Sequence, residues 1–488
     1  MTRRQLFELA QSASIYLFAG KIFFGQKVLA QARDSFQRSD LPNFMSTLPA
    51  FDGVFLLDTN SLKLYSRDFG LNFSARPQGI LKPANSKDIQ KMAIYCNSRN
   101  IPLTIRGGGG SAYGQSQIQN GIVIDTTTLK KIQWITNNTV SLDVGLIWKE
   151  VTDFTLKKKM IPPVLPDTLA TTVGGLLSAG GLGETSYNLG SLADHVFEIE
   201  VVTLSGEIKL ASANQNADLF YSALGGMGQT CIITQVKLNL MRAPDNVKTL
   251  EFSYDFEDPQ LFLDMINFQS REPRGALGGH FLRPDSGSFR WQYQMHATFW
   301  GRDSASWIQQ MRGKLVETKI RKFDEYINRN TQSWIEAVKS GALEWPRPYL
   351  SFFMPFETGP ATLKHLFNSP EALLGVSKFY TAPVAKGSFK RPFLSLPQSE
   401  NILHFRLYKV FKDKPGSADH VRALRSNELD LIPRILNNGG TVYLPFAKPL
   451  TDQEVRNQYP QRLLQTFAQL KNHYDRKLLL NQGVGIFN

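Results

Sequence analysis

The sequence predicts an α+β protein with more than one domain, and three observations lead to this prediction. The chain has 488 residues, which is too many for one compact core. Short apolar strands alternate with amphipathic helices between residues 79 and 240, and glycine clusters interrupt them. From about Pro244 the pattern changes to long aromatic strands and helices, which indicates a second unit with an antiparallel sheet covered by helices.

The first unit begins after a predicted linker over residues 33–75. Residues 79–81 form a short predicted strand, and Ser86 is a candidate N-cap for the helix that follows. The apolar residues of this helix recur at helical spacing, as Ile89, Met92, Ala93 and Cys96. The stretches "IPLTI", "GIVIDTT" and "TVSLDVG" predict three more strands, and Trp148 to Leu156 predicts an amphipathic helix.

One glycine cluster, "IRGGGGSAYGQS" from Ile105 to Ser116, places four consecutive glycines directly after a strand. Such a run weakens regular structure and marks a turn or a close approach of the backbone to a ligand. It also fits a dinucleotide-binding pattern from Gly107 to Ala112, but the residues that follow are poor helix formers, which argues against a Rossmann fold. A loop that cradles a phosphate group is the interpretation that remains.

A second cluster, "PDTLATTVGGLLSAGG" over residues 166–181, precedes a predicted strand from Val196 to Thr203 and a Ser-Gly hairpin turn. The stretch "ADLFYSALGGMGQTCIITQVKLNL" then predicts a helix, a glycine turn and a strand. In the second unit, helices are predicted over residues 306–340 and 417–437. The chain is expected to end with a helix and an extended tail.

Composition argues against several classes of protein. The net charge is +13, but Lys and Arg are scattered without a long basic run, so we expect no nucleic-acid partner. Cys96 and Cys231 lie in apolar stretches and are expected to be buried. Two cysteines cannot form a disulfide framework, and no clustered His and Cys spacing indicates a metal site. No later segment has the length and apolarity of a membrane span, so no stable membrane insertion is expected.

The N-terminal residues 1–32 have the layout of a twin-arginine signal segment. Arg3 and Arg4 precede a moderately apolar stretch, and the sequence Ala-Gln-Ala at 30–32 permits cleavage after small residues. This layout predicts a periplasmic or secreted protein. The alternative is an amphipathic N-terminal helix.

Five segments together resemble one known family: "RGGGGSAYGQ", "PDTLATTVGGLLSAGG", "HVFEIEVVTLSGEI", "ALGGMGQTCIITQVKL" and "YDRKLLLNQGVGIFN". Their order and spacing are similar to those of the p-cresol methylhydroxylase-type FAD-binding fold of the vanillyl-alcohol oxidase superfamily. Within it the chain most resembles the cytokinin dehydrogenases and their bacterial relatives. The resemblance implies a two-subdomain FAD-binding module plus a substrate domain. The expected boundaries are 1–32 for the signal segment, 33–74 for the linker and start of the FAD domain, 75–244 for the FAD-binding domain, 245–440 for the substrate domain, and 441–488 for the C-terminal return.

The resemblance implies FAD as cofactor, with the loop from Arg106 to Ser111 around its pyrophosphate. The expected FAD contacts are Arg106, Gly107, Gly108, Gly109, Gly110, Ser111, Gln115, Asp167, Thr172, Gly175, Ser178, Leu182, Ile232, Tyr443 and Asn481. Members with a covalently attached flavin carry a histidine where this chain has Gly110. The resemblance therefore implies a non-covalent FAD.

Asp167 matches the catalytic base of the family, which accepts a proton as a hydride leaves the adjacent carbon of the substrate for the flavin. Without the family, the simpler interpretation is an aspartate after Pro166 that starts a turn. The glutamate that holds the adenine ring in plant members has no clear counterpart here, and the nearest stretch offers His280 or Arg283.

The function implied is that of an FAD-dependent oxidoreductase, cytokinin dehydrogenase-like, which oxidises a C–N bond in a cytokinin-like secondary amine. Its partners would be a small-molecule substrate and an electron acceptor such as oxygen or a quinone. Oxidation of a C–OH group in a sugar, lactone or other alcohol is the alternative within enzymes. A flavin-binding protein without turnover, or a basic nucleic-acid binder, is the third hypothesis.

Overall fold

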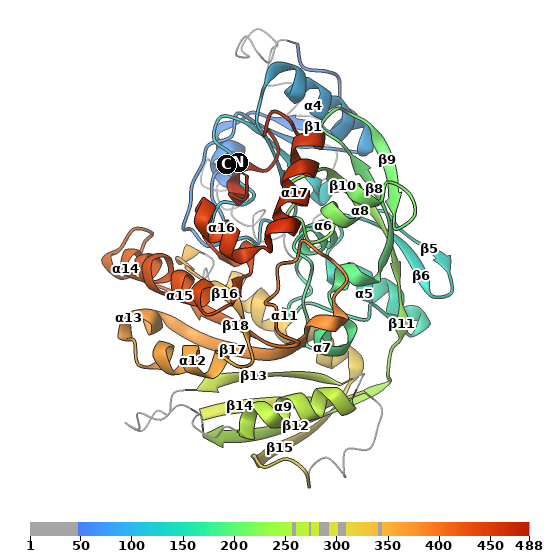
Figure 1. Cartoon of the computed structure of the whole chain (residues 1–488). Coiled ribbons are helices and arrows are strands. Elements are labelled where there is room, and N and C mark those ends of the chain that lie inside the picture. The colour runs from blue at the N-terminus through green and yellow to red at the C-terminus, as the bar shows by residue number, and fades with distance from the viewer. Residues whose placement is uncertain are drawn as a thin grey trace, which may run out of the picture.

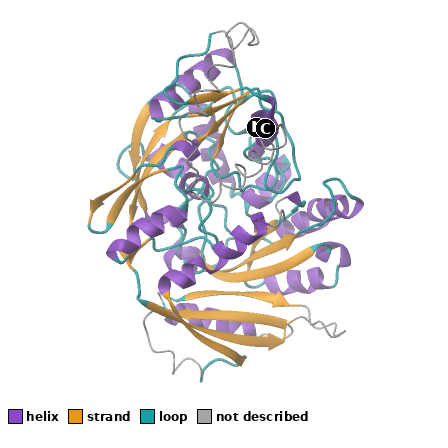
Figure 2. Ribbon diagram, turned by 180° about the vertical axis from the view of Figure 1, so that it is seen from behind, coloured by secondary structure: helices purple, strands orange, loops and turns teal. Residues whose placement is uncertain are grey.

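The computed structural model describes residues 47–255, 260–272, 275–282, 292–300, 309–339 and 344–487. Three larger sheets organise these residues, and two of them lie together at one end of the molecule, with the third at the other end (Figure 2). Helices and strands are mixed throughout, which confirms the predicted α+β class. The predicted signal segment 1–32 and Arg283 lie outside the described residues.

The first sheet has the strand order β1-β2-β4-β3 and carries the glycine loop at the end of β3. Strand β4 pairs in parallel with β2 and with β3, and β1 pairs antiparallel with β2 at the edge. Helix α3 (Thr59–Tyr65) follows β1 within the stretch expected to be a linker. The strands are β1 (Val54–Leu56), β2 (Gly79–Lys82), β3 (Leu103–Arg106) and β4 (Ile122–Asp125).

Helix α4 (Ser86–Arg99) packs against these strands with the four apolar residues that the spacing predicted, and all four are buried. The predicted cap is wrong by one position. Asn85 has an extended backbone and its side chain accepts a hydrogen bond from the amide of Asp88, whereas Ser86 is already helical.

The second sheet is antiparallel, with the order β5-β6-β10-β8-β9. Its core is continuous with that of the first sheet. The hairpin between β8 and β9 turns at Gly206, where φ is +88°, as the Ser-Gly pair predicted. The elements are β5 (Ile132–Thr136), β6 (Thr139–Asp143), β8 (Val196–Val202), β9 (Ile208–Ser212), β10 (Ile232–Asn239), α5 (Trp148–Thr155), α6 (Val173–Ser178) and α8 (Ala217–Ala223).

The third sheet has eight antiparallel strands in the order β15-β12-β14-β13-β17-β18-β16-β19. Helices cover it, as predicted for the second unit (Figure 1). The strands are β12 (Asn246–Asp255), β13 (Ala276–Leu282), β14 (Gln292–Phe299), β15 (Lys314–Lys322), β16 (Leu350–Pro355), β17 (Val376–Ala385), β18 (Asn401–Lys409) and β19 (Thr441–Val442).

One helix prediction in this unit is wrong in part. Within the predicted helix 306–340, residues 314–322 form strand β15, and helix α11 (Phe323–Lys339) begins only afterwards. The reason is tertiary: β15 pairs along its length with β12, and this ladder decides the conformation. The prediction over 417–437 is confirmed, since α14 (Ala418–Ser426), a π-helical turn and α15 (Ile432–Asn437) follow one another there.

The two faces of the eight-stranded sheet differ in chemistry. One face is apolar and packs against α9 (Gln260–Arg271), α12 (Gly359–Phe367) and α15. The opposite face presents polar and aromatic side chains from the same strands, because side chains alternate along each strand. Helix α11 lies on this second face and packs its Phe323, Tyr326 and Ile327 into the core of the first unit. The polar face of the sheet therefore faces the first unit.

The C-terminal segment returns to the first sheet. Helix α16 (Asp452–Gln458) contacts α15 of the second unit, and helix α17 (Gln461–Tyr474) contacts α8 of the first, in red beside green in Figure 1. Leu103 in β3 then donates its amide to the carbonyl of Leu479 at 2.8 Å and accepts from the amide of Asn481 at 2.9 Å. The end of the chain is thus hydrogen-bonded beside the strand that carries the glycine loop.

Candidate FAD and substrate site

The glycine loop folds tightly against the second glycine cluster. The amide of Gly108 donates to Oγ1 of Thr172 at 3.2 Å. At Gly107, a Cβ would lie only 2.2 Å from the same oxygen, so a side chain has no room there. Gly109 has φ of +69°, a conformation that favours glycine. The sequence therefore needs bare backbone at these positions to bring the two clusters together.

The loop fits an anionic group. Among the described residues, the amides of Gly109, Gly110 and Ser111 donate to no other group. Gly110 is exposed, and a Cβ at this position would meet nothing within 4 Å. Consecutive free amides beside open space form the kind of concave nest that binds phosphate. This is the chemistry that the pyrophosphate of FAD requires.

The side chain of Arg106 contacts other protein groups and packs against the glycine loop. Its guanidinium stands over the ring of Tyr65 at 5.2 Å and donates to the carbonyl of Arg67 at 3.2 Å. A Cβ at Gly109 would come within 2.6 Å of this guanidinium. Burial lowers the pKa of Arg106, while the nearby Tyr65, Asp125 and Asp68 oppose that shift. Arg106 therefore stabilises the conformation of the loop through contacts within the protein.

Two predicted contact residues use their side chains to join segments. Gln115 donates from Nε2 to the carbonyls of Leu444 and Ala447 at 2.7 and 2.8 Å, which ties the loop to the C-terminal return. Asn481 accepts from the amide of Ile105 at 2.9 Å and donates to the carbonyl of Gly228 at 2.8 Å. The side chains of both residues therefore bond to other parts of the protein and hold the glycine loop and strand β3 in place.

Six other predicted contacts lie in three parts of the first unit and its surroundings. Thr172 and Gly175 lie beside the glycine loop, and Gly175 is exposed. Leu182 and Tyr443 lie in one apolar cluster that includes Phe353 of β16. Burial raises the pKa of Tyr443. The last two are Ser178, whose carbonyl accepts from the amide of Met227 at the glycine turn, and Ile232, the buried first residue of β10.

Asp167 lies where the first unit meets the polar face of the eight-stranded sheet. Its carboxylate forms an ion pair with the guanidinium of Arg406 in β18. In the sheet register, Arg406 stands beside Tyr380 of β17 on one side and Ser351 of β16 on the other. Only four residues separate Asp167 from Thr172 along the chain, so the predicted base and the phosphate-binding cluster are close neighbours.

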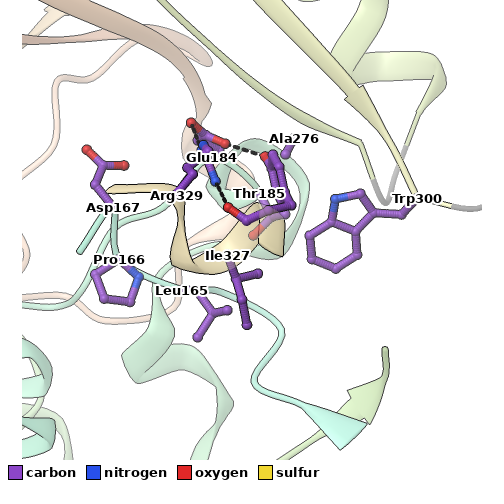
Figure 3. Close-up of a pocket in the computed structure, with 10 residues that line it drawn as sticks. Leu165, Pro166, Asp167, Glu184, Thr185, Ala276, Trp300, Ile327 and Arg329 are labelled. Atoms are coloured by element: carbon purple, nitrogen blue, oxygen red, sulfur yellow. Dashed lines mark hydrogen bonds and ion pairs between the residues drawn. The ribbon is translucent and has the colours of Figure 1, made fainter. Parts of the chain in front are cut away.

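A small cavity of ≈ 40 Å³ lies beside Asp167. Asp167 and Trp300 stand at opposite ends of its lining, with Glu184 and Arg329 between them (Figure 3). Glu184 accepts from Arg329 at 2.7 Å and from the hydroxyl of Tyr326 at 2.5 Å. Burial alone would raise the pKa of Glu184, but the charge of Arg329 and the hydrogen bond from Tyr326 outweigh it, and the pKa is lowered.

His280 also lies on the polar face, next to Tyr380 in the register of β13 and β17. Its ring stacks on that of His296 with 5.1 Å between centroids, and the two rings share a hydrogen bond at 3.2 Å. Burial and the neighbouring His296 lower the pKa of His280 to about 4. The imidazole is therefore neutral at physiological pH and belongs to a histidine pair, which the sequence did not predict.

Sequence reasoning missed Arg406, Tyr380, Glu184 and Arg329. One signal was available: in "NILHFRLYK", the polar residues His404 and Arg406 alternate with Phe405 and Leu407, which predicts one polar and one apolar face of a strand. Nothing in the sequence indicated that this face meets Asp167, which is 239 residues away along the chain.

Comparison with known proteins agrees with this geometry. Residues 77–212 match the FAD binding domain family. Among solved structures, 6-hydroxy-D-nicotine oxidase from Arthrobacter nicotinovorans has the same fold, with a TM-score of 0.70 and 16% identity over 89% of this chain and 97% of that one. Residues 77–212 therefore form an FAD-binding domain and FAD is the cofactor, in agreement with the predicted resemblance to the p-cresol methylhydroxylase-type oxidoreductases.

The full-length relatives are oxidoreductases as well. One is an uncharacterized oxidoreductase in the fasciation locus of Rhodococcoides fascians, which is 27% identical over 88% of this chain and 98% of its own length. Cytokinin dehydrogenase 7 of Oryza sativa subsp. japonica is 26% identical over 88% of this chain and 91% of its own length. Cytokinin dehydrogenase 1 of Arabidopsis thaliana is 25% identical over 92% of this chain and 85% of its own length.

The described ranges contain no group of three or more His, Cys, Asp or Glu residues that could hold a metal ion. Within the same ranges, no helix combines the length and the apolarity needed to cross a membrane.

Proposed function

We propose that this protein dehydrogenates the C–N bond of a small secondary amine, with Asp167 as the general base. The observation that carries the proposal is the position of Asp167, between the phosphate-binding glycine clusters and the polar face of the eight-stranded sheet. FAD, when bound, supplies the acceptor for a hydride. The protein supplies the base, the substrate surface and the exclusion of water.

Different residues are proposed to bind FAD, to accept the proton and to contact the substrate. The free amides of Gly109, Gly110 and Ser111 bind the pyrophosphate, and Thr172 holds the loop in shape. Asp167 accepts the proton from the substrate nitrogen as the adjacent carbon is oxidised. The polar face around Tyr380 and Arg406 forms the opposite wall of the substrate site. The relatives named cytokinin dehydrogenase support a secondary amine as substrate.

We also infer that FAD is bound without a covalent link to Gly110, which has no side chain to form one. The test is acid precipitation of the purified yellow protein. All colour should remain in the supernatant, and colour in the washed pellet would contradict a dissociable cofactor. Export through the predicted segment 1–32 and the nature of the electron acceptor stay predictions.

The proposed reaction is tested by mixing the protein with candidate substrates in the absence of oxygen. Productive chemistry bleaches the absorbance of the oxidised flavin. Bleaching by isopentenyladenine or by other secondary amines supports the proposal. Bleaching by polyols or lactones alone would assign the protein to C–OH oxidation, and no bleaching by either group would indicate flavin binding without turnover.

A further inference from the structure

The guanidinium of Arg406 depends on Asp167 for its counter-charge. Arg406 lies on the polar face of β18 with its side chain only 17% exposed, and its ion-pair partner is Asp167, at 24%. An arginine stays charged under all physiological conditions, even when buried. Burial lowers the pKa of Arg406, but the charge of Asp167 outweighs this effect and the pKa is raised overall.

The proposed reaction removes this counter-charge. When Asp167 accepts a proton from the substrate, its carboxylate becomes neutral, and a neutral substrate would leave Arg406 with a buried, uncompensated charge. Losing one partner of a buried ion pair is strongly unfavourable. Glu184 does not fill the gap, because it already accepts from Arg329 and Tyr326. An anionic substrate would keep Arg406 paired before and after the proton transfer.

Two unused hydrogen-bonding groups beside Asp167 support an anionic ligand. Nε of Arg406 and the hydroxyl of Tyr380 are buried and have no partner within the described part of the chain. The guanidinium of Arg406 lies 4.0 Å above the ring of Tyr380, so the two side chains are adjacent. Both groups can donate a hydrogen bond. A carboxylate, which only accepts, matches them, and arginine binds carboxylates through two parallel hydrogen bonds.

We propose that the substrate is an N-substituted amino acid and that Arg406 leaves Asp167 to bind the substrate carboxylate, which frees Asp167 to act as the base. The inference rests on the proposed function and names the substrate class for it. The nitrogen loses its proton to Asp167, the adjacent carbon loses a hydride with its electron pair to the bound flavin, and the product is an imino acid. Arg406 is thus a residue that determines specificity.

The experiment compares two substrates that differ only in charge: N-benzylglycine and its methyl ester. Each is mixed anaerobically with the FAD-loaded wild type, Arg406→Gln, Arg406→Lys and the exposed control Arg422→Gln. Benzoate, which carries the carboxylate but cannot be dehydrogenated, is titrated into each protein and followed by the flavin spectrum and by the melting temperature. The mandelate and methyl mandelate pair repeats the comparison for a C–OH bond.

We expect wild type and Arg422→Gln to prefer the acid over the ester by about 10- to 100-fold in the second-order rate of flavin reduction, the range of a charge-assisted hydrogen-bond pair. Arg406→Gln should lose this preference and weaken benzoate binding by a similar factor, and Arg406→Lys should keep part of both. Equal rates with acid and ester in wild type would overturn the inference and leave the proposed function standing. Benzoate binding that needs Arg406, without bleaching by any amine, would retain the anion site and overturn the proposed function.

Discussion

Gly107 and Gly110 stand three positions apart in one loop, but a side chain would have a different effect at each. At Gly107 a Cβ would lie 2.2 Å from Oγ1 of Thr172, whereas at Gly110 it would meet no atom within 4 Å. A side chain at Gly107 would therefore disturb the packing of the loop, whereas a methyl group at Gly110 has room and leaves the backbone amide in place.

We expect Gly107→Ala to displace the loop from Thr172 and to lower the affinity for FAD at least tenfold, because the free amides lose their arrangement. Gly110→Ala is the matched control and should bind FAD like wild type. Titration of the apoprotein with FAD, followed by fluorescence quenching, measures both. Wild-type affinity in Gly107→Ala would show that the contact with Thr172 is not needed.

In the proposed reaction, Asp167 is both the general base and the counter-charge of Arg406. Asp167→Asn should lower the rate of anaerobic flavin reduction by roughly 10²- to 10⁴-fold, the usual effect of losing a general base. It should also lower the free energy of unfolding by roughly 1–3 kcal/mol, because Arg406 loses its counter-charge in a partly buried site. Stopped-flow absorbance and urea unfolding measure the two effects. Asp153→Asn on the exposed side of α5 should change neither, and an unchanged rate in Asp167→Asn would remove the assignment.

At the scale of single elements, strand β18 separates two environments. Arg406 lies on the polar face and pairs with Asp167, and three residues later Lys409 is fully buried on the helix-covered face, where its Nζ donates to Oδ1 of Asn427 at 2.7 Å. Burial lowers the pKa of Lys409 from its ordinary 10.5 to about 7. Between these two values the folded protein binds one proton fewer than the unfolded chain.

This difference predicts that stability rises with pH. The free energy of unfolding should increase from pH 7 toward pH 10 by up to about 1.4 kcal/mol per pH unit from this lysine. Lys409→Met should remove the increase, since methionine fills similar space without a charge. Urea unfolding of wild type, Lys409→Met and the exposed control Lys414→Met at pH 7, 8 and 9 gives the slopes. Equal slopes in all three proteins would show that Lys409 does not titrate in this range.

At the scale of the whole molecule, the C-terminal segment joins parts of the chain that are far apart in sequence. Asn481 bonds to Ile105 in β3 and to Gly228 in the glycine turn before β10. Gln115 in the glycine loop bonds in turn to Leu444 and Ala447. These contacts make the glycine loop and strand β3 depend on residues of the C-terminal segment, more than 300 positions away in the sequence.

Asn481→Leu should therefore lower the free energy of unfolding by roughly 2–4 kcal/mol, because the amide of Ile105 and the carbonyl of Gly228 are left buried without partners. It should also weaken FAD retention, since β3 carries the glycine loop. Gln482→Leu, at an exposed neighbouring position, is the control and should resemble wild type. Thermal unfolding with and without added FAD tests both expectations. A wild-type melting temperature in Asn481→Leu would contradict the role of this junction.

Local pattern predicted much of this fold because local physics controls it. The spacing of Ile89, Met92, Ala93 and Cys96 identified a helix face, and the glycine clusters identified the phosphate loop, since only bare backbone packs so closely against Thr172. The resemblance of five such clusters to one family then indicated FAD. The helix prediction for residues 314–322 was wrong because pairing with β12, and not the local propensity, makes this stretch a strand.

The sequence by itself determined the α+β class, because the pattern of strands and helices depends on residues that are near one another in the chain. The resemblance of its segments to one family added the expected FAD loop and the candidate base. The tertiary structure alone decided what faces that base. The ion pair between Asp167 and Arg406 joins residues 239 positions apart, and it exists only because the polar face of an eight-stranded sheet packs toward the FAD-binding unit. Counter-charge and shape in a buried site come from such long-range packing, which no local pattern in the sequence specifies.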